Sequence, residues 1–166
     1  MSIFIVMGVS GCGKSSVARQ LAQATSGEFL DADDFHPMTN RDKMAAGIPL
    51  QDDDRWGWLG LLNEALKHRE HSPHHTFLAC SALRQIYRDR LSKNLEKLTF
   101  IYLRGSKESI LKRLEERTDH FMPPALLESQ FSTLEEPSDG LIISIEQPLS
   151  EVVAEILKRL QARSTI

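Results

Sequence analysis

A glycine-rich turn between an apolar run and a helical pattern constrains this chain more than any other feature. Residues 3–7 are continuously apolar, which is typical of a short strand buried on both faces of a parallel sheet. Residues 8–15 read G-V-S-G-C-G-K-S and match the pattern G-x-x-x-x-G-K-[ST]. From Lys14 to Gly27, apolar residues recur at helical spacing. This order of strand, loop and helix predicts a phosphate-binding loop and disfavours an accidental glycine-rich turn.

Each residue type in this loop has a physical role toward a nucleotide. Glycines let the backbone wrap around the β-phosphate with its N–H groups inward, and the N-terminus of the following helix adds partial positive charge. Lys14 neutralises the β/γ oxygens, and Ser15 offers its hydroxyl to Mg²⁺. The predicted ATP-binding residues of the loop are Gly8, Ser10, Gly11, Cys12, Gly13, Lys14, Ser15 and Ser16.

The rest of the chain alternates short strand patterns with longer helical ones. Further strands are predicted at residues 29–30, 77–80, 100–103 and 141–143, and further helices at 39–46, 53–69, 83–91, 106–117 and 149–162. This order predicts a three-layer α/β fold of the P-loop NTPase class, with a five-stranded parallel sheet flanked by helices. With 166 residues we expect a single domain over residues 1–166 and ligands at the carboxyl ends of the strands.

Composition excludes some partners. Twenty Lys and Arg against 23 Asp and Glu give a net charge of -3, which provides no general attraction to nucleic acid or to an anionic membrane. The apolar run at residues 3–7 is far too short to span a bilayer. Cys12 and Cys80 match no metal-ligand spacing, so we expect reduced thiols and a cytoplasmic location.

A phosphate-binding loop alone leaves a kinase, a switch GTPase, a motor ATPase and a nucleotide-gated binding module open. The chain has no Asn-Lys-x-Asp guanine reader, and residues 54–57 fit Asp-x-x-Gly only by chance at a helix start. A large ATPase would usually carry an acidic residue at the end of the strand at 77–80, where Cys80, Ser81 and Ala82 stand instead. These observations favour a kinase of a small metabolite.

Four blocks extend the pattern over most of the chain. They comprise residues 8–15; residues 30–37 with 43–50 and 52–56; residues 80–83 with 87–91; and residues 120–123 with 129–135. In these blocks the sequence resembles the gluconate kinase (gluconokinase) family, which is related to shikimate and nucleoside-monophosphate kinases. Cys12 and Ser16 depart from the Ser and Thr that relatives often carry, but neither side chain is needed to hold phosphate.

Two aspartates follow the second predicted strand. If strand geometry continues, Asp31 and Asp33 share one face, because side chains alternate with a period of two. The resemblance implies that Asp31 acts near Mg²⁺ through water and that Asp33 takes the proton of the attacking hydroxyl. A helix N-cap or a solvated turn is the alternative for this acidic run, and we expect that role for Asp34.

The resemblance also implies an acceptor site. Arg55 would hold the carboxylate of the acid with two hydrogen bonds, supported by a buried neighbour, Trp56; the alternative is an ordinary i,i+4 surface pair. His36 and Lys43 are weaker candidates for the hydroxyls or the acid group. The predicted acceptor-binding residues are Asp33, His36, Lys43, Arg55, Ser81 and Gln130.

A segment near residues 117–130 is expected to form a mobile lid that excludes water. Arg117 is the candidate to stabilise charge on the transferring phosphoryl group, and Arg113 is the candidate to lie against adenine. Both could instead be solvated arginines of an amphipathic helix. The turn at residues 145–148, which includes Pro148, is the expected contact to the adenine edge.

The resemblance therefore implies an enzyme that transfers the γ-phosphoryl group of ATP to D-gluconate with Mg²⁺, and a homodimer is expected. One rival is a shikimate-kinase-like enzyme for another small hydroxy acid; against it, residues 80–82 replace the glycine triplet of shikimate kinases, and residues 120–123 are foreign to them. The other rival is a nucleotide-switched binding protein without turnover, which the intact Lys14, Ser15 and Asp33 disfavour.

Overall fold

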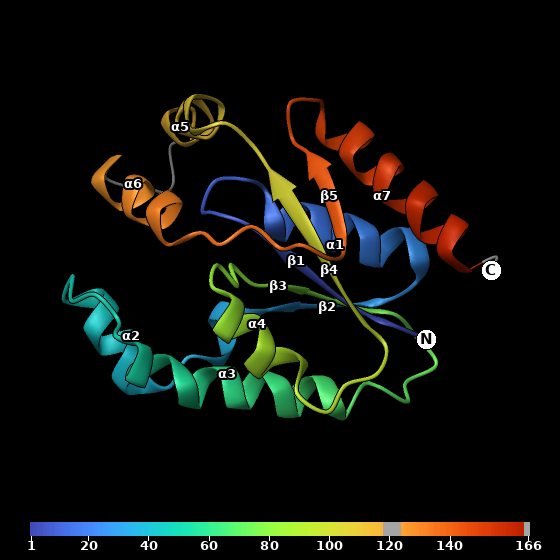
Figure 1. The fold of residues 1–166 in the computed structure, drawn as a ribbon, viewed down its shortest axis with the longest axis horizontal. Coiled ribbons are helices and arrows are strands. Elements are labelled where there is room, and N and C mark those ends of the chain that lie inside the picture. The colour runs from blue at the N-terminus through green and yellow to red at the C-terminus, as the bar shows by residue number, and fades with distance from the viewer. Residues whose placement is uncertain (118–123, 165–166) are drawn as a thin grey trace.

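The computed structural model describes residues 1–117 and 124–164, and these form a three-layer α/β domain (Figure 1). The strands pair in the order β2-β3-β1-β4-β5, and every pair is parallel. The predicted five-stranded parallel sheet is therefore confirmed. The elements are β1 (Ile3–Met7), α1 (Lys14–Thr25), β2 (Glu28–Asp31), the 3₁₀ helix η1 (Ala32–Phe35), α2 (Met38–Ala45), α3 (Asp52–Lys67), β3 (Thr76–Ala79), α4 (Gln85–Ser92), β4 (Leu98–Arg104), α5 (Lys107–Glu115), α6 (Pro124–Thr133), β5 (Leu141–Ser144) and α7 (Leu149–Ser164).

The central strand β1 is buried on both faces, as its unbroken apolar sequence predicts. Its side chains alternate between two cores, so that Phe4 and Val6 join one and Ile3, Ile5 and Met7 join the other. The first core packs against α1, α5 and α7, and the second packs against α3 and α4. Figure 1 shows these helices above and below the sheet. Hydrophobic burial on both faces therefore fixes the position of β1 in the fold.

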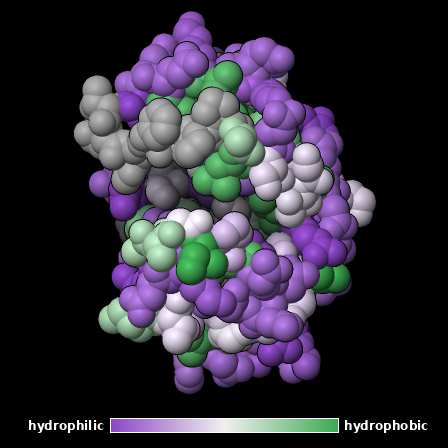
Figure 2. Space-filling view, turned by 90° about the vertical axis from the view of Figure 1, so that its left-hand side faces the viewer, coloured by the Kyte–Doolittle hydropathy of each residue, from purple (hydrophilic) through white to green (hydrophobic). Residues whose placement is uncertain are grey.

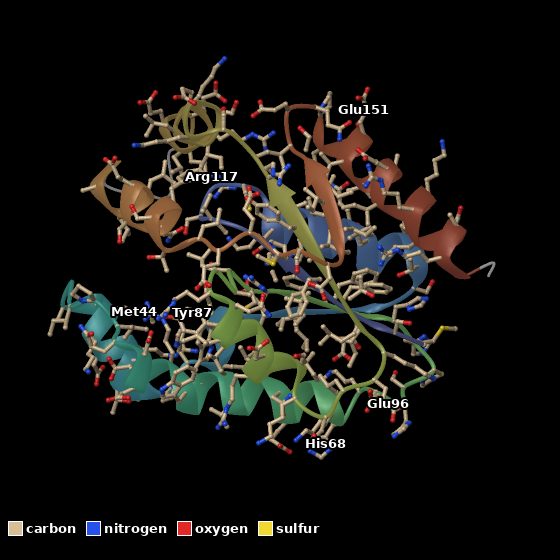
Figure 3. All side chains as sticks on the ribbon, viewed as in Figure 1. Met44, His68, Tyr87, Glu96, Arg117 and Glu151 are labelled. Carbon is tan, nitrogen blue, oxygen red and sulfur yellow. The ribbon has the colours of Figure 1, made fainter. Side chains whose placement is uncertain are left out.

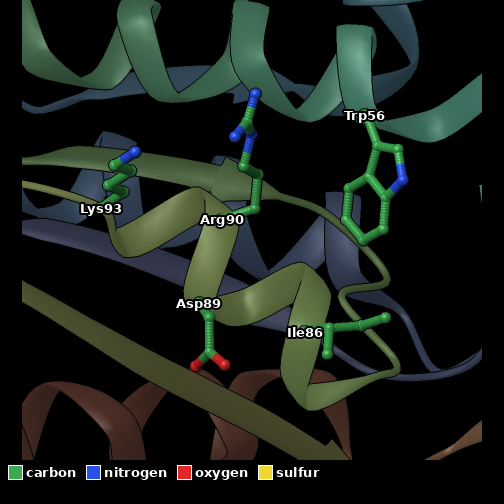
Figure 4. Close-up of a pocket in the computed structure, with 5 residues that line it drawn as sticks. All are labelled: Trp56, Ile86, Asp89, Arg90 and Lys93. Atoms are coloured by element: carbon green, nitrogen blue, oxygen red, sulfur yellow. The ribbon is translucent and has the colours of Figure 1, made fainter. Parts of the chain in front are cut away.

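One prediction about α3 was wrong. Trp56 was expected on the apolar stripe, but Trp58 is the buried tryptophan, and its indole N–H donates to the Ala32 carbonyl at 2.7 Å. Trp58 continues the face of α3 formed by Leu59, Leu62 and Leu66, whereas Trp56 is half-buried. Figure 4 shows the Trp56 ring extending from α3 toward α4, where it lines a pocket together with residues of α4.

The remaining helices gather at the end of the sheet where the strands finish. In Figure 1, α5 and α6 lie at the upper left and α2 at the lower left, on the side toward which β4 points. Within residues 1–117 and 124–164, no helix is long and apolar enough to cross a membrane. The carboxyl edge of the sheet is thus surrounded by three helices, and the predicted site residues lie there.

Candidate functional site

The loop between β1 and α1 has the backbone geometry of a phosphate-binding loop. Gly8, Gly11 and Gly13 all adopt positive φ, at 146°, 84° and 93°, which glycine tolerates without steric cost. A Cβ at Gly11 would lie only 2.8 Å from Cγ of Leu114, so α5 packs directly onto the loop. No side chain caps the N-terminus of α1, and its first turn carries no acidic residue. Its free N–H groups and positive dipole end therefore suit an anion.

The two side chains that end the loop make the contacts expected of a nucleotide site. The ammonium Nζ of Lys14 donates to the Val9 carbonyl at 3.1 Å. The hydroxyl of Ser15 donates to Oδ2 of Asp31 at 3.2 Å, across the sheet edge from the end of β2. A hydroxyl beside a carboxylate is a set of oxygen donors that fits Mg²⁺. The structure thus brings together the two residues predicted for the metal.

Asp33 does not continue the strand, so that part of the prediction was wrong. β2 ends at Asp31, and η1 begins at Ala32. The carboxylate of Asp31 accepts a hydrogen bond from the backbone N–H of Asp33 at 3.0 Å and caps η1. Asp31, rather than Asp34, is therefore the capping residue. The short helix still leaves Asp33 accessible from solvent at the sheet edge.

The electrostatic surroundings of Asp33 suit a proton acceptor. Partial burial raises the pKa of its carboxyl, and the negative charge of Asp31 raises it further. The positive charge of Lys14, and that of the His36 ring when it is protonated, oppose that shift. A carboxylate whose pKa moves toward neutral pH is a better general base.

The predicted acceptor side is formed by η1, α2 and the start of α3. The imidazole of His36 is buried and stacks on Trp58, with ring centroids 4.1 Å apart. Its Nδ1 lies 3.3 Å from the side-chain amide of Asn40. Burial lowers the pKa of His36, which leaves the ring neutral and suited to a hydroxyl. The Lys43 ammonium is already paired with Asp54 at 2.7 Å.

Arg55 lies in a charged cluster at the N-terminus of α3. Its guanidinium is 3.6 Å from Asp52, an i,i+3 pair, and stands over the ring of Tyr87 at 5.5 Å. Asp52 also accepts hydrogen bonds from the Tyr87 hydroxyl at 2.5 Å and from Arg84 at 2.8 Å. Figure 3 shows Tyr87 in the lower half of the molecule, at the start of α4. These contacts hold the Arg55 guanidinium in place. They use fewer than its five N–H donors, so it can also bind a carboxylate.

Sequence reasoning missed the partners that hold this cluster. Asp52, Arg84 and Tyr87 come from two helices that are adjacent only in the folded chain. No spacing pattern could have joined them. Asp52 and Tyr87 do fall in blocks of family resemblance, and this was the available signal.

The end of β3 supplies backbone contacts beside the loop. The Ser81 carbonyl accepts from the N–H of Gly8 at 3.3 Å, and Ala82 adopts a positive φ of 46°. The thiol of Cys80 is buried, and burial raises its pKa to about 12, so it is chemically inert. Both Cys12 and Cys80 are free thiols, as expected. Ser81 is thus adjacent to the nucleotide loop.

Two of the predicted lid residues contact the nucleotide side of the site. Arg113 on α5 donates to the Ile145 carbonyl at 2.5 Å, in the turn that also contains Pro148. Gln130 on α6, which was predicted to contact the acceptor, instead hydrogen bonds to Ser10 of the loop. Arg117 follows α5 directly and is exposed (Figure 3). The resemblance block at 120–123 lies outside the described residues.

The site opens on one side of the molecule. Figure 2 shows that face hollowed between an upper and a lower half. The glycine-rich loop with its positive φ angles, the Lys14 and Ser15 side chains that follow it, and the five-stranded parallel sheet together define a P-loop phosphotransferase for small molecules.

Comparison with known proteins agrees with this class. A family model described as shikimate kinase matches residues 10–161. Thermoresistant gluconokinase of Escherichia coli strain K12 is 44% identical over 95% of this chain and 94% of its own. The thermosensitive gluconokinase of the same organism is 47% identical over 92% and 83%. A crystal structure of a gluconokinase from Sinorhizobium meliloti 1021 superposes with a TM-score of 0.84, at 40% identity over 98% of this chain and 97% of that one.

The chain therefore belongs to the gluconokinase family, within the broader group that the shikimate kinase model describes.

The environment of Asp33 can be tested in the ligand-free protein. We expect its carboxyl to titrate above its ordinary pKa of 3.8, and we expect Asp31→Asn to lower that pKa, because Asp31 is the largest charged contributor to the shift. An asparagine keeps the oxygen that caps η1. Asp34→Asn is the matched control and should shift the pKa less, because Asp34 contributes least. Carbon-detected NMR titration of the carboxyls, assigned with Asp33→Asn, measures both; a pKa at or below 3.8 contradicts the account.

Proposed function

We propose that this chain is an ATP-dependent gluconokinase that converts D-gluconate and ATP into 6-phospho-D-gluconate and ADP. The observation that carries the proposal is the contact between the phosphate-binding loop and the end of β2, where the Ser15 hydroxyl donates to Asp31 and the Asp31 carboxylate also accepts from the backbone N–H of Asp33. The proposed proton acceptor, Asp33, thus follows directly after a strand end that contacts the phosphate-binding loop. The named relatives support gluconate as the acceptor.

The loop at residues 8–15 holds the triphosphate of ATP with inward N–H groups and with the N-terminus of α1. When ATP binds, the Lys14 ammonium exchanges its hydrogen bond to the Val9 carbonyl for contacts to the β- and γ-phosphate oxygens. Ser15 and Asp31 would hold Mg²⁺, directly and through water, and the ion when bound neutralises phosphate charge. The adenine lies against Arg113 and the turn that contains Pro148, which already contact each other through the Ile145 carbonyl.

Transfer needs positioning and charge neutralisation more than covalent chemistry by the protein. The gluconate hydroxyl oxygen forms a bond to the γ-phosphorus while the bond to the oxygen of the ADP leaving group breaks. The hydroxyl proton passes to the carboxylate of Asp33, whose raised pKa favours its uptake. Lys14 and Arg117 stabilise the negative charge on the transferring group.

The acceptor is held by the arm that η1, α2 and α3 form. Arg55 binds the carboxylate of gluconate with its planar fork, and the Asp52 and Tyr87 cluster orients that fork. The neutral ring of His36 suits a hydroxyl of the sugar acid. Lys43 and the backbone at Ser81 complete the acceptor site.

The proposal extends to assembly and location. The family resemblance supports a homodimer. The free, buried thiols of Cys12 and Cys80 fit a reducing compartment, and the cytoplasm is the one we propose.

The substrate is tested with a panel of sugar acids and shikimate in a coupled assay for ADP release. We expect ATP-dependent phosphorylation of D-gluconate and no comparable turnover with shikimate, because Cys80, Ser81 and Ala82 stand where shikimate kinases carry glycines. Lys14→Ala is the inactive control. Turnover of shikimate in preference to gluconate would support the alternative of a shikimate-kinase-like enzyme. Nucleotide binding without any turnover would support the alternative of a nucleotide-switched binding protein.

Arg55 is tested by two substitutions. A lost hydrogen-bonded pair to a charged group costs about 1.5–3 kcal/mol, so kcat/KM for gluconate should fall about 10- to 150-fold in Arg55→Ala. Arg55→Lys should be nearly as damaging, because an ammonium cannot reproduce the fork. The dissociation constant of ATP should hardly change.

The control for this pair is Arg90→Lys, since Arg90 lies on α4 in the groove beside Trp56 and outside the site. It should keep parental kinetics. If Arg55→Lys is as active as the parent, the proposed bidentate contact is wrong. Lys43 or His36 would then be the better candidate to bind the carboxylate.

A further inference from the structure

Gln130 holds the phosphate-binding loop at two points. The backbone N–H of Ser10 donates to Oε1 of Gln130 at 2.7 Å, and Nε2 of Gln130 donates to Oγ of Ser10 at 3.0 Å. The two residues are 120 positions apart in the sequence. A glutamine matches this pair because one end of its side chain carries both an acceptor and a donor.

The loop needs such a contact because of its composition. Ser10 lies between Gly8 and Gly11, which adopt positive φ, and glycine loses more conformational freedom on ordering than any other residue. A loop that is ordered only when a ligand arrives subtracts this entropy from the binding free energy. A loop that is held in advance avoids most of that loss.

The end of α6 is anchored firmly enough to hold Ser10. Just after the helix, the Glu135 N–H donates to the Leu83 carbonyl at 2.8 Å, and the Glu135 carbonyl accepts from Arg88 at 2.8 Å. The Arg88 side chain is only 2% exposed, and it also donates to the Ala82 carbonyl at 2.8 Å. A buried guanidinium thus fixes the chain that follows α6 to the loop after β3.

We propose that Gln130 is a positioning residue for the nucleotide, fixing Ser10 so that the phosphate-binding loop is preformed before ATP binds. This inference rests on the proposed kinase function and gives Gln130 a different role from the acceptor contact that the sequence suggested. The oxygen and the nitrogen of its amide both hydrogen bond to Ser10, so the side chain restrains the loop. In this proposal the acceptor is bound by the residues around Arg55 instead.

The test measures binding of a non-hydrolysable ATP analogue with Mg²⁺, together with steady-state kinetics. In Gln130→Ala we expect the dissociation constant of the analogue to rise about tenfold, as for the loss of one to two net hydrogen bonds. The KM for ATP should rise with it, and the KM for gluconate should stay within about twofold, because the acceptor arm is untouched. Ser10→Ala, which keeps the backbone bond, should cost about threefold.

A double-mutant cycle isolates the contact. If Gln130 acts through Ser10, Ser10→Ala should add nothing to Gln130→Ala. Glu128→Ala is the matched control, because Glu128 lies on the same helix and pairs only at the surface, with Lys107 at 2.9 Å. It should leave analogue binding and the midpoint of thermal unfolding unchanged.

Any of three results would overturn the inference. The first is an unchanged analogue affinity in Gln130→Ala, and the second is fully multiplicative effects in the cycle. The third is a rise in the KM for gluconate without a change in analogue binding, which would make Gln130 a contact to the acceptor. The dissociation constant of the ATP analogue is measured without turnover. It therefore tests the role of Gln130 even if the chain does not phosphorylate gluconate, and the two failures can be distinguished.

Discussion

The burial of β1 between β3 and β4 is the constraint on which the rest of the structure depends. Both faces of β1 are covered, so the strand cannot slide or turn without exposing apolar surface to water. Its end at Met7 is therefore fixed in space. The loop that follows must turn back into α1 within six residues, and glycines at positive φ make that turn. A rigid core thus sets the position of the phosphate-binding amides.

The same sheet edge brings opposite charges together. Asp31 and Asp33 leave the end of β2, while Lys14 and Ser15 begin α1, and parallel strands place all four at one edge. Asp31 accepts from Ser15 and also caps η1, so its orientation is defined twice. Among residues 1–117 and 124–164, no hydrogen bond restrains the carboxylate of Asp33, whose pKa is raised. These different surroundings fit the different roles that we propose for the two carboxylates.

The acceptor side is built differently, from side chains that hold one another. Asp52 lies among Arg55, Arg84 and Tyr87, and it binds all three in an arrangement that crosses from α3 to α4. The three charged side chains are partly exposed, so each ion pair is weak alone, whereas Tyr87 is buried. Together they restrict the directions in which Arg55 can point. Such preorganisation would lower the cost of fixing the flexible, polyhydroxylated acid that we propose as the acceptor.

The sequence predicted what depends on local pattern and missed what depends on tertiary packing. The loop, its strand and its helix follow from adjacent residues, and the order of strands and helices was enough for the parallel sheet. The path after Asp31 could not be read in this way, because Asp31 itself caps η1 and turns the chain out of the strand. Trp56 and Trp58 are the same residue type, but Trp58 lies on the buried face of α3 with Leu62 and Leu66 and donates to the Ala32 carbonyl. The contact of Gln130 with Ser10 spans 120 residues and has no local signal.

The central proposal is that Asp33 accepts the proton of the attacking hydroxyl. The most direct measurement is a rapid-quench single-turnover experiment on Asp33→Asn, with ATP and gluconate saturating, alongside the ATP dissociation constant. Asparagine keeps the shape of the side chain and cannot take the proton, so the phosphoryl-transfer rate should fall about 100-fold or more, as for the loss of a general base. The dissociation constant of ATP should stay near that of the parent. A transfer rate close to the parent's, with weakened ATP binding in its place, would make Asp33 a residue of the metal site and contradict the account.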